Sequence, residues 1–124
     1  MVLHFSSGRN YADFNYLEKV FHTAINREDI VALSIGTRPD CLPDNILDML
    51  EKLNQIKPVW VELGLQSTKP ETVEYIRRGY DNSIYENAVK ELKKRGITVI
   101  THIIIGLPNE AKTDILNTVD YAVK

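Results

Sequence analysis

Cysteine is almost absent from this chain, and the sequence has neither a strong charge imbalance nor a long apolar run. Cys41 is the single cysteine among 124 residues, which excludes an internal disulfide and a cysteine-ligated metal cluster built from this chain alone. The formal net charge of −2 gives no indication of a basic nucleic-acid-binding face. No apolar run reaches the roughly 18 residues of a membrane span, and residues 1–5 lack the layout of a signal peptide. We therefore expect a cytoplasmic protein without a membrane partner.

Familiar catalytic patterns are also missing. The sequence has no pair of catalytic carboxylates, no glycine pattern of a phosphate-binding loop and no spacing typical of a zinc site. Cys41 is expected to be inert. The residues alone therefore identify neither a catalytic side chain nor a metal ligand.

What the chain does contain is a regular alternation of apolar strands and amphipathic helices. Strands are predicted to begin near Val2, Val31, Val59 and Ile97, at intervals close to the ~30 residues of a βαβ unit. Strands that alternate with helices predict a parallel sheet with right-handed crossovers.

The helices are predicted from the spacing of apolar residues and from their end signals. Apolar periods predict helices over residues 16–25 and 43–53, and a final helix that starts after Thr113 and runs to Lys124. The segment after the third strand is predicted to hold two helices, a short one to Arg78 and a longer one to Arg95. Thr68 and Ser83 each begin a capping box, and Pro43 suits a first helical turn. Gly96 suits the position just after a helix, where a positive φ is common.

One face of each predicted strand is apolar, whereas the other is small or polar. In the third strand, Trp60, Glu62, Gly64 and Gln66 share a face because side chains alternate along a strand. A doubly wound sheet is covered by helices on both sides and is apolar on both faces. The pattern instead favours an α/β fold of about four parallel βα units, a partial TIM-type barrel with helices on the outer face. A full barrel takes about 250 residues, so residues 1–124 are expected to form one partial domain of a longer parent, or to assemble with another copy.

Candidate binding residues lie at the carboxyl ends of these strands, where α/β folds bind ligands. Glu62 and Gln66 could bind a polar ligand such as a ribose, and the alternative is a satisfied buried polar pair. His102 is either a core histidine or a third member of this group. Ile104 and Gly106 form either a plain turn or a packing surface for a flat ring.

Two arginine segments and one polar loop can each be interpreted as binding a ligand or as having only a structural role. Arg38 either neutralises a substrate anion or pairs with Asp40. Arg77 and Arg78 either bind a carboxylate with their planar donors or favour a helix C-terminus. The loop with Ser6, Ser7 and Gly8 either presents backbone N–H groups to a ligand or is an ordinary polar loop.

Several segments together resemble the radical S-adenosylmethionine (SAM) superfamily. They are residues 62–67 (ELGLQS), 77–79 (RRG), 94–96 (KRG) and 102–108 (HIIIGLP). The domain type resembles that of coproporphyrinogen III dehydrogenase and the Elongator catalytic subunit. Residues 33–43 (LSIGTRPDCLP) resemble a signature of the YhcC-like branch. The resemblance extends from about Leu3 to the end of the chain.

The resemblance implies an enzyme with two cofactors and an unknown substrate. Such proteins bind a [4Fe–4S] cluster through a Cys-x3-Cys-x2-Cys loop after the first barrel strand and reduce SAM to methionine and a 5′-deoxyadenosyl radical. This chain has no such loop, and its first strand corresponds to the family's second. We therefore expect a fragment, strands two to five of the parent barrel, which binds no cluster and performs no radical chemistry.

The resemblance also implies roles for individual residues. Gln66 corresponds to a SAM ribose contact, Arg78 to a contact of the methionine carboxylate, and Ile104 and Gly106 to the adenine-packing segment. His102 stands where the porphyrinogen enzyme has an acidic ribose contact. Ser6, Ser7 and Gly8 fall where a glycine-rich loop holds the methionine amino group, although the glycine run is missing. Glu62 is expected only to line the site.

An alternative from another functional class is a non-catalytic α/β binding or interaction module. Its exposed sheet would be covered by another copy of the chain. Both interpretations leave strand edges unpaired, which favours association. We therefore expect a homo-oligomer.

Overall fold

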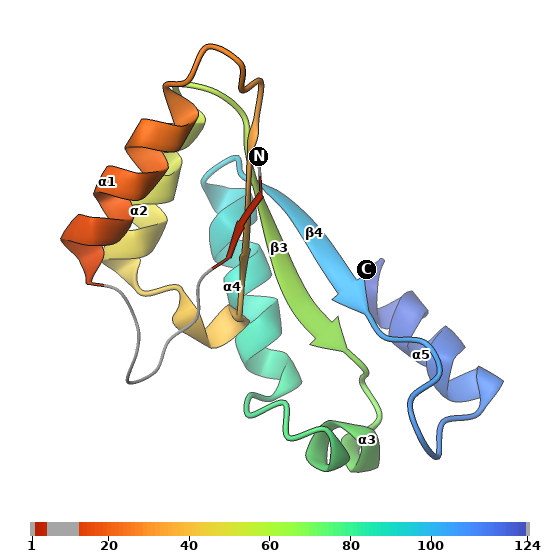
Figure 1. Ribbon diagram of the computed structural model, residues 1–124. Coiled ribbons are helices and arrows are strands. Elements are labelled where there is room, and N and C mark those ends of the chain that lie inside the picture. The colour runs from red at the N-terminus through yellow and green to blue at the C-terminus, as the bar shows by residue number, and fades with distance from the viewer. Residues whose placement is uncertain (1, 5–12, 124) are drawn as a thin grey trace.

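A parallel four-stranded sheet organises the molecule (Figure 1). The computed structural model describes residues 2–4 and 13–123. The strands are β1 (Val2–His4), β2 (Leu33–Thr37), β3 (Val59–Gln66) and β4 (Thr98–Ile103), paired in the order β1-β2-β3-β4. All three pairings are parallel, as the alternation of strands and helices predicts. The second strand begins at Leu33 rather than Val31, and Val31 is exposed.

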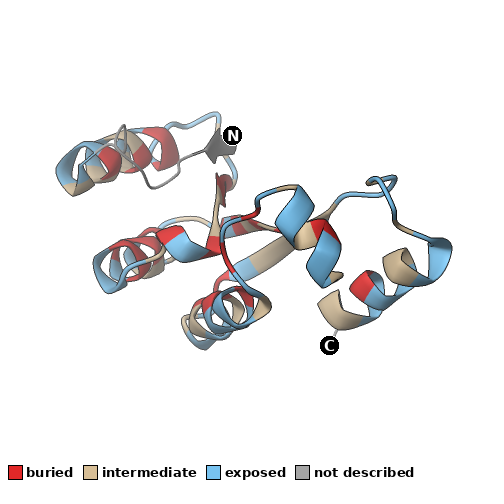
Figure 2. Ribbon diagram, turned by 90° about the horizontal axis from the view of Figure 1, so that it is seen from below, coloured by how far each residue is buried: buried red, intermediate tan, exposed pale blue. Residues whose placement is uncertain are grey.

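Within the described residues, five α-helices connect and flank the strands. They are α1 (Phe14–Ile25), α2 (Asp44–Asn54), α3 (Pro70–Tyr75), α4 (Asn82–Lys94) and α5 (Lys112–Ala122). Viewed along the strands, α1, α2 and α4 lie on the same side of the sheet, and α5 lies beyond β4 (Figure 2). A short 3₁₀ helix, Pro39–Cys41, follows β2 and was not predicted.

Burial along β3 alternates with the strand period. Val59, Val61, Leu63 and Leu65 face the helices and are at most 1% exposed, whereas Trp60 on the opposite face is 41% exposed. Burial of each such aliphatic side chain contributes about 1.5–3 kcal/mol. The prediction that helices cover only the apolar face is therefore confirmed for β3, and the polar face stays accessible.

Two predicted helix starts are wrong. The N-cap of α3 is Lys69 rather than Thr68, because the Thr68 hydroxyl bonds Thr118 on α5 instead (3.1 Å). The N-cap of α4 is Asp81 rather than Ser83, and its carboxylate accepts the Ile84 N–H (3.1 Å). A carboxylate at this position is a strong cap, so it takes the place expected for the serine.

Pro43 and Gly96 were also predicted to mark helix ends, and only Gly96 lies where it was expected. Pro43 stands at the N-cap of α2, one position before the first turn where it was expected. Gly96 has a φ of 76° and follows α4 as predicted. Its N–H donates to the Lys93 carbonyl and the Ile97 N–H donates to the Leu92 carbonyl, both at 3.0 Å. This pair of bonds is a Schellman motif, which requires the left-handed conformation that glycine adopts without strain.

Candidate functional site

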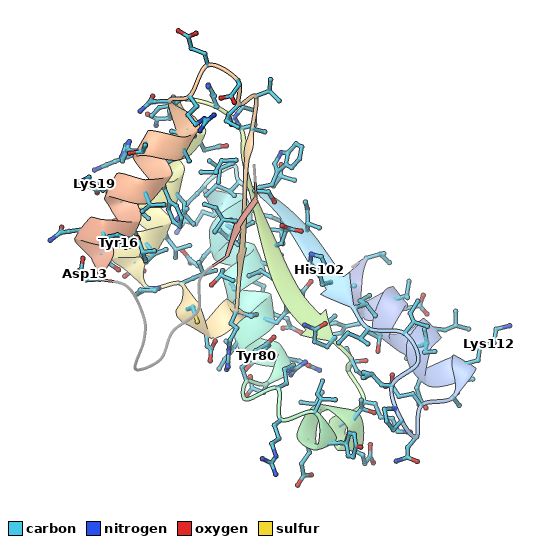
Figure 3. All side chains as sticks on the ribbon, in the orientation of Figure 1. Asp13, Tyr16, Lys19, Tyr80, His102 and Lys112 are labelled. Atoms are coloured by element: carbon cyan, nitrogen blue, oxygen red, sulfur yellow. The ribbon has the colours of Figure 1, made fainter. Side chains whose placement is uncertain are left out.

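A hydrogen-bonded row of polar side chains crosses three strands on the accessible face of the sheet. The Ser34 hydroxyl on β2 donates to Glu62 Oε2 on β3 (2.9 Å), and His102 Nε2 on β4 lies 2.9 Å from Glu62 Oε1. The side chain of Glu62 is 18% exposed, and that of His102 is 55% exposed. Figure 3 labels His102 on β4. Glu62 therefore joins a buried hydroxyl to an accessible imidazole.

Gln66 ends β3 in a strained conformation. Its φ is 64°, in the left-handed region that non-glycine residues rarely adopt. The Ser67 N–H donates to the Leu65 carbonyl across it (2.8 Å), and the β3–β4 register shifts between Gly64 and Gln66. Such an outlier costs on the order of 1–3 kcal/mol and persists where the surroundings enforce it, often at a binding site.

The Gln66 carboxamide lies over the backbone of Gly64. A Cβ added at Gly64 would come within 3.0 Å of Gln66 Nε2, closer than real Cβ contacts, and would lie 3.3 Å from the Tyr80 hydroxyl. Gly64 is also the cross-strand partner of His102. The missing side chain at residue 64 therefore leaves room for the carboxamide over the position that is paired with His102.

Arg78 braces the loop that follows β3. Its guanidinium donates to the Leu65 and Ser67 carbonyls (both 3.0 Å), to the Tyr80 carbonyl (2.8 Å) and to Asn82 Oδ1 (3.0 Å). The residue is only 6% exposed, and desolvation lowers its pKa below the usual value. Because Leu65 and Ser67 flank Gln66, Arg78 holds the strained turn in place.

Tyr80 connects Arg78 to Arg38. The Arg78 guanidinium carbon lies 4.8 Å from the centre of the Tyr80 ring and that of Arg38 lies 5.3 Å from it, within the range of cation–π contacts. The Tyr80 hydroxyl donates to the Gly64 carbonyl, and burial raises the pKa of Tyr80. Figure 3 labels Tyr80 beyond the carboxyl ends of the strands. The ring therefore supports the backbone beneath the Gln66 carboxamide.

Arg38 is paired within its own loop. It donates to both carboxylate oxygens of Asp40, from Nε at 3.0 Å and from Nη2 at 2.8 Å. This pairing raises the pKa of Arg38. The Arg38 side chain is still 43% exposed, so it can approach an anion on its open side.

The exit of β4 presents apolar surface next to Gln66. The Ile104 N–H donates to the Gln66 carbonyl (3.1 Å), which ties this exit to the strained turn. Ile104 is 43% exposed, and Gly106 has a φ of 93° with no atom within 4 Å of the place where a Cβ would stand. Ile104 therefore offers accessible apolar surface on which a flat ring can pack, and the space beside Gly106 is open.

The structure brings most of the predicted site residues together. Glu62 contacts His102, and Gln66 is bonded to Ile104 and braced by Arg78. The predicted loop of Ser6, Ser7 and Gly8 lies outside the described residues. Sequence reasoning missed Ser34 and Tyr80. Ser34 shares the strand parity of the polar face, and this parity together with the strand register would have placed it near Glu62.

The described side chains suit the nucleoside of SAM but not a [4Fe–4S] cluster. Cys41 is 2% exposed and contacts Asp40, and the part of the chain described here contains no group of three His, Cys, Asp or Glu residues that could hold a metal. A [4Fe–4S] cluster therefore has no ligand set among these residues. The apolar surface of Ile104, the open space beside Gly106 and the amide of Gln66 do suit a nucleoside, which combines a flat ring with hydroxyl groups. Within the described ranges, no helix is long and apolar enough to cross a bilayer.

Comparison with known proteins connects this geometry to a family. The chain matches the Radical SAM superfamily over residues 2–122. It is 38% identical over 115 residues to Protein YhcC of Escherichia coli (strain K12), covering 92% of this chain and 37% of YhcC. It is 42% identical over 108 residues to protein YtqA of Bacillus subtilis (strain 168), covering 87% of this chain and 34% of YtqA. The chain thus spans little more than a third of the length of these relatives.

A solved structure agrees with the sequence matches. The archaeal Elp3 of Methanocaldococcus infernus, with residues 1–46 deleted, superposes with a TM-score of 0.66 at 28% sequence identity. The match covers 84% of this chain and 24% of the Elp3 chain. The chain belongs to the radical SAM superfamily, in its YhcC-like branch.

Proposed function

We propose that this chain is part of a longer radical SAM enzyme and carries the nucleoside half of its SAM site. The observation that carries the proposal is the strained turn at Gln66, whose carbonyl accepts the N–H of the exposed Ile104 at the exit of β4. A strained non-glycine residue at the carboxyl end of a parallel strand is typical of a binding site rather than of a structural turn.

Within the parent enzyme, a cluster held by other residues and SAM would together supply a carbon-centred radical. The residues of this chain would bind and orient the SAM nucleoside. The Gln66 carboxamide binds the ribose hydroxyls, and Ile104 packs against the adenine ring, which approaches closely because Gly106 has no side chain. These contacts would hold the reactive end of SAM at the carboxyl edge of the sheet.

Arg78 has a double role in this proposal. Four of the five N–H donors of a guanidinium are used by protein oxygens, which supports a bracing role for the Gln66 turn. The remaining Nη2 donor is available to the methionine carboxylate of SAM. Arg38, held by Asp40 at the end of β2, would neutralise an anionic group of the substrate.

The proposed parent has a TIM-type barrel, of which this chain forms about half. The support comes from the helices on one side of the sheet and from the accessible polar face of β3 on the other (Figure 2). A closed barrel would enclose that face and exclude water from the site. The alternative is a self-associating module, which is supported by the exposed apolar residues Ile105, after β4, and Val123, at the end of α5.

The SAM site is tested by titrating the isotopically labelled chain with SAM and following its amide signals by NMR. We expect saturable shifts at Gln66, Ile104 and Gly106, reproduced by adenosine, because the contacts are to the nucleoside. Gln66→Ala should weaken binding, whereas Gln55→Ala, a change at the chain's other glutamine, which is exposed, should not. Unchanged signals at these three residues, or equal affinity of the Gln66 variant, would contradict the assignment.

The oligomeric state tests the alternative and the predicted homo-oligomer, because unpaired strand edges favour association under both interpretations. A self-associating module should be a homodimer or larger at micromolar concentration, measured by size-exclusion chromatography with light scattering. A monomer under these conditions would exclude the module and the predicted homo-oligomer together, and would leave the SAM site to its own test.

A further inference from the structure

The hydrogen-bonded row of Ser34, Glu62 and His102 has a consequence beyond lining the site. We infer that Glu62, anchored by Ser34, is a positioning residue that keeps the proton of the His102 imidazole on Nε2. His102 Nδ1 then accepts a hydrogen bond from a ligand hydroxyl on the accessible face of the sheet. The inference rests on the proposed function, because the hydroxyl is that of the SAM ribose.

The proton assignment follows from the chemistry of the contacts. A carboxylate oxygen only accepts, so the 2.9 Å contact between His102 Nε2 and Glu62 Oε1 places a hydrogen on Nε2. A neutral imidazole carries one N–H, so Nδ1 keeps a lone pair. A carboxylate that holds one nitrogen of a histidine sets the tautomer and thereby the chemistry of the other nitrogen.

Burial and register keep Glu62 in this position. Ser34 is only 7% exposed, and its hydroxyl donates to Oε2, so both carboxylate oxygens are engaged. The cross-strand partner of Glu62 on β2 is Gly36, and that of His102 on β3 is Gly64. Because neither glycine carries a side chain, the carboxylate reaches Ser34 on one side and the imidazole on the other.

Together with Gln66, the row would supply both a donor and an acceptor for one ligand hydroxyl. The Gln66 carboxamide nitrogen lies over Gly64, the cross-strand partner of His102. A carboxamide N–H donates to a hydroxyl oxygen, and the hydroxyl proton then requires an acceptor. The lone pair on His102 Nδ1 supplies this acceptor without placing a second carboxylate on the accessible face.

The first test measures the tautomer without any ligand. The ¹⁵N chemical shifts of the imidazole nitrogens are recorded on this chain at about pH 9, well above the ordinary pKa of histidine side chains in general. The His102 signals are identified by their loss in His102→Asn. We expect the Nε2–H tautomer in the wild type. In Glu62→Gln the carboxamide can donate to Nε2, so the proton should move to Nδ1 in a large fraction of molecules. Glu28→Gln, an accessible matched change, should leave the tautomer unchanged.

The second test measures SAM affinity by NMR titration of the same variants. Glu62→Gln should weaken binding about 3- to 10-fold, the effect of losing one neutral hydrogen bond, and Glu28→Gln should have no effect. An Nδ1–H tautomer in the wild type, or the same tautomer in wild type and Glu62→Gln, would overturn the inference even where SAM binds. If the wild type fails to bind SAM, the proposed function fails, and the ligand-free shifts still decide whether Glu62 sets the tautomer.

Discussion

Gly64 and Gly96 offer a paired test that separates binding from stability. At Gly64, an alanine Cβ would come within 3.0 Å of Gln66 Nε2, so the carboxamide has to move. Atoms in van der Waals contact lie roughly 3.5–4 Å apart, so the carboxamide nitrogen has to move by more than about 1 Å. Hydrogen bonds from N–H groups span only about 2.7–3.2 Å. Gly64→Ala should therefore break one Gln66 bond to the ligand and weaken SAM binding about 3- to 10-fold.

The same substitution should change the free energy of unfolding little. The displaced group is the end of a flexible side chain, and the Tyr80 hydroxyl at 3.3 Å has to yield only slightly. Replacing glycine also restricts the unfolded chain, which stabilises the fold by roughly 0.4–1 kcal/mol and offsets this crowding. We expect a net change within about 1 kcal/mol, measured by urea unfolding.

Gly96→Ala is the matched control with the opposite expectation. No atom lies within 4 Å of the added Cβ, but the φ of 76° strains any residue other than glycine. This variant should lose about 1 kcal/mol of stability and bind SAM as the wild type does. Unchanged SAM affinity in Gly64→Ala, or a loss of binding in Gly96→Ala equal to that in Gly64→Ala, would refute the geometric argument.

Three other substitutions test separate parts of the structure by urea or acid unfolding. Arg77 has a φ of 52° just after α3, so Arg77→Gly should stabilise the protein by about 0.5–1 kcal/mol, and a loss of stability would contradict the assigned strain. Ser34→Ala removes a hydrogen bond to the Glu62 carboxylate and should cost about 1.5–3 kcal/mol, whereas a cost near zero would mean that the bond does not anchor Glu62. Hydrogen bonds from Ser83 and Ile84 lower the pKa of Asp81. Their stabilising effect is present above the ordinary pKa of 3.8 and is lost as the pH falls through the lowered value. Asp81→Asn should therefore reduce the pH dependence of stability below about pH 4, and an unchanged acid transition would exclude this role.

The sheet and helices could be predicted because short-range patterns determine them. The alternation along β3 and the apolar period of α1 each identify one buried face within a single element. Helix ends were less predictable, because the side chain that caps a helix depends on competing partners. Thr68 matches a capping pattern, yet α5 brings Thr118 into hydrogen-bond distance, and that contact is 50 residues away in the sequence.

The candidate site was likewise predictable where local patterns determine it, and not where distant residues do. Strand parity predicted that Glu62 and Gln66 share the accessible face, and the structure confirms this parity. The bond between Ser34 and Glu62 depends on the register between β2 and β3, which no local pattern in the sequence determines. The donors of Arg78 likewise reach carbonyls 11 and 13 residues away, so its bracing role requires the three-dimensional turn.

The strain at Gln66 is sustained by Arg78 and Tyr80, whose bonds to the backbone are made without a ligand. Arg78 binds the carbonyls on both sides of the turn, and the Tyr80 hydroxyl binds the carbonyl of Gly64. Removing Arg78 would take a donor from the carbonyl of the buried Ser67, at a cost of about 1–3 kcal/mol, whereas the Leu65 carbonyl would keep the Ser67 N–H. That cost is comparable to the strain of a single backbone outlier, on the order of 1–3 kcal/mol. The turn at Gln66 can therefore exist only while this bracing is intact, which makes Arg78 and Tyr80 as necessary to the site's geometry as the residues that line it.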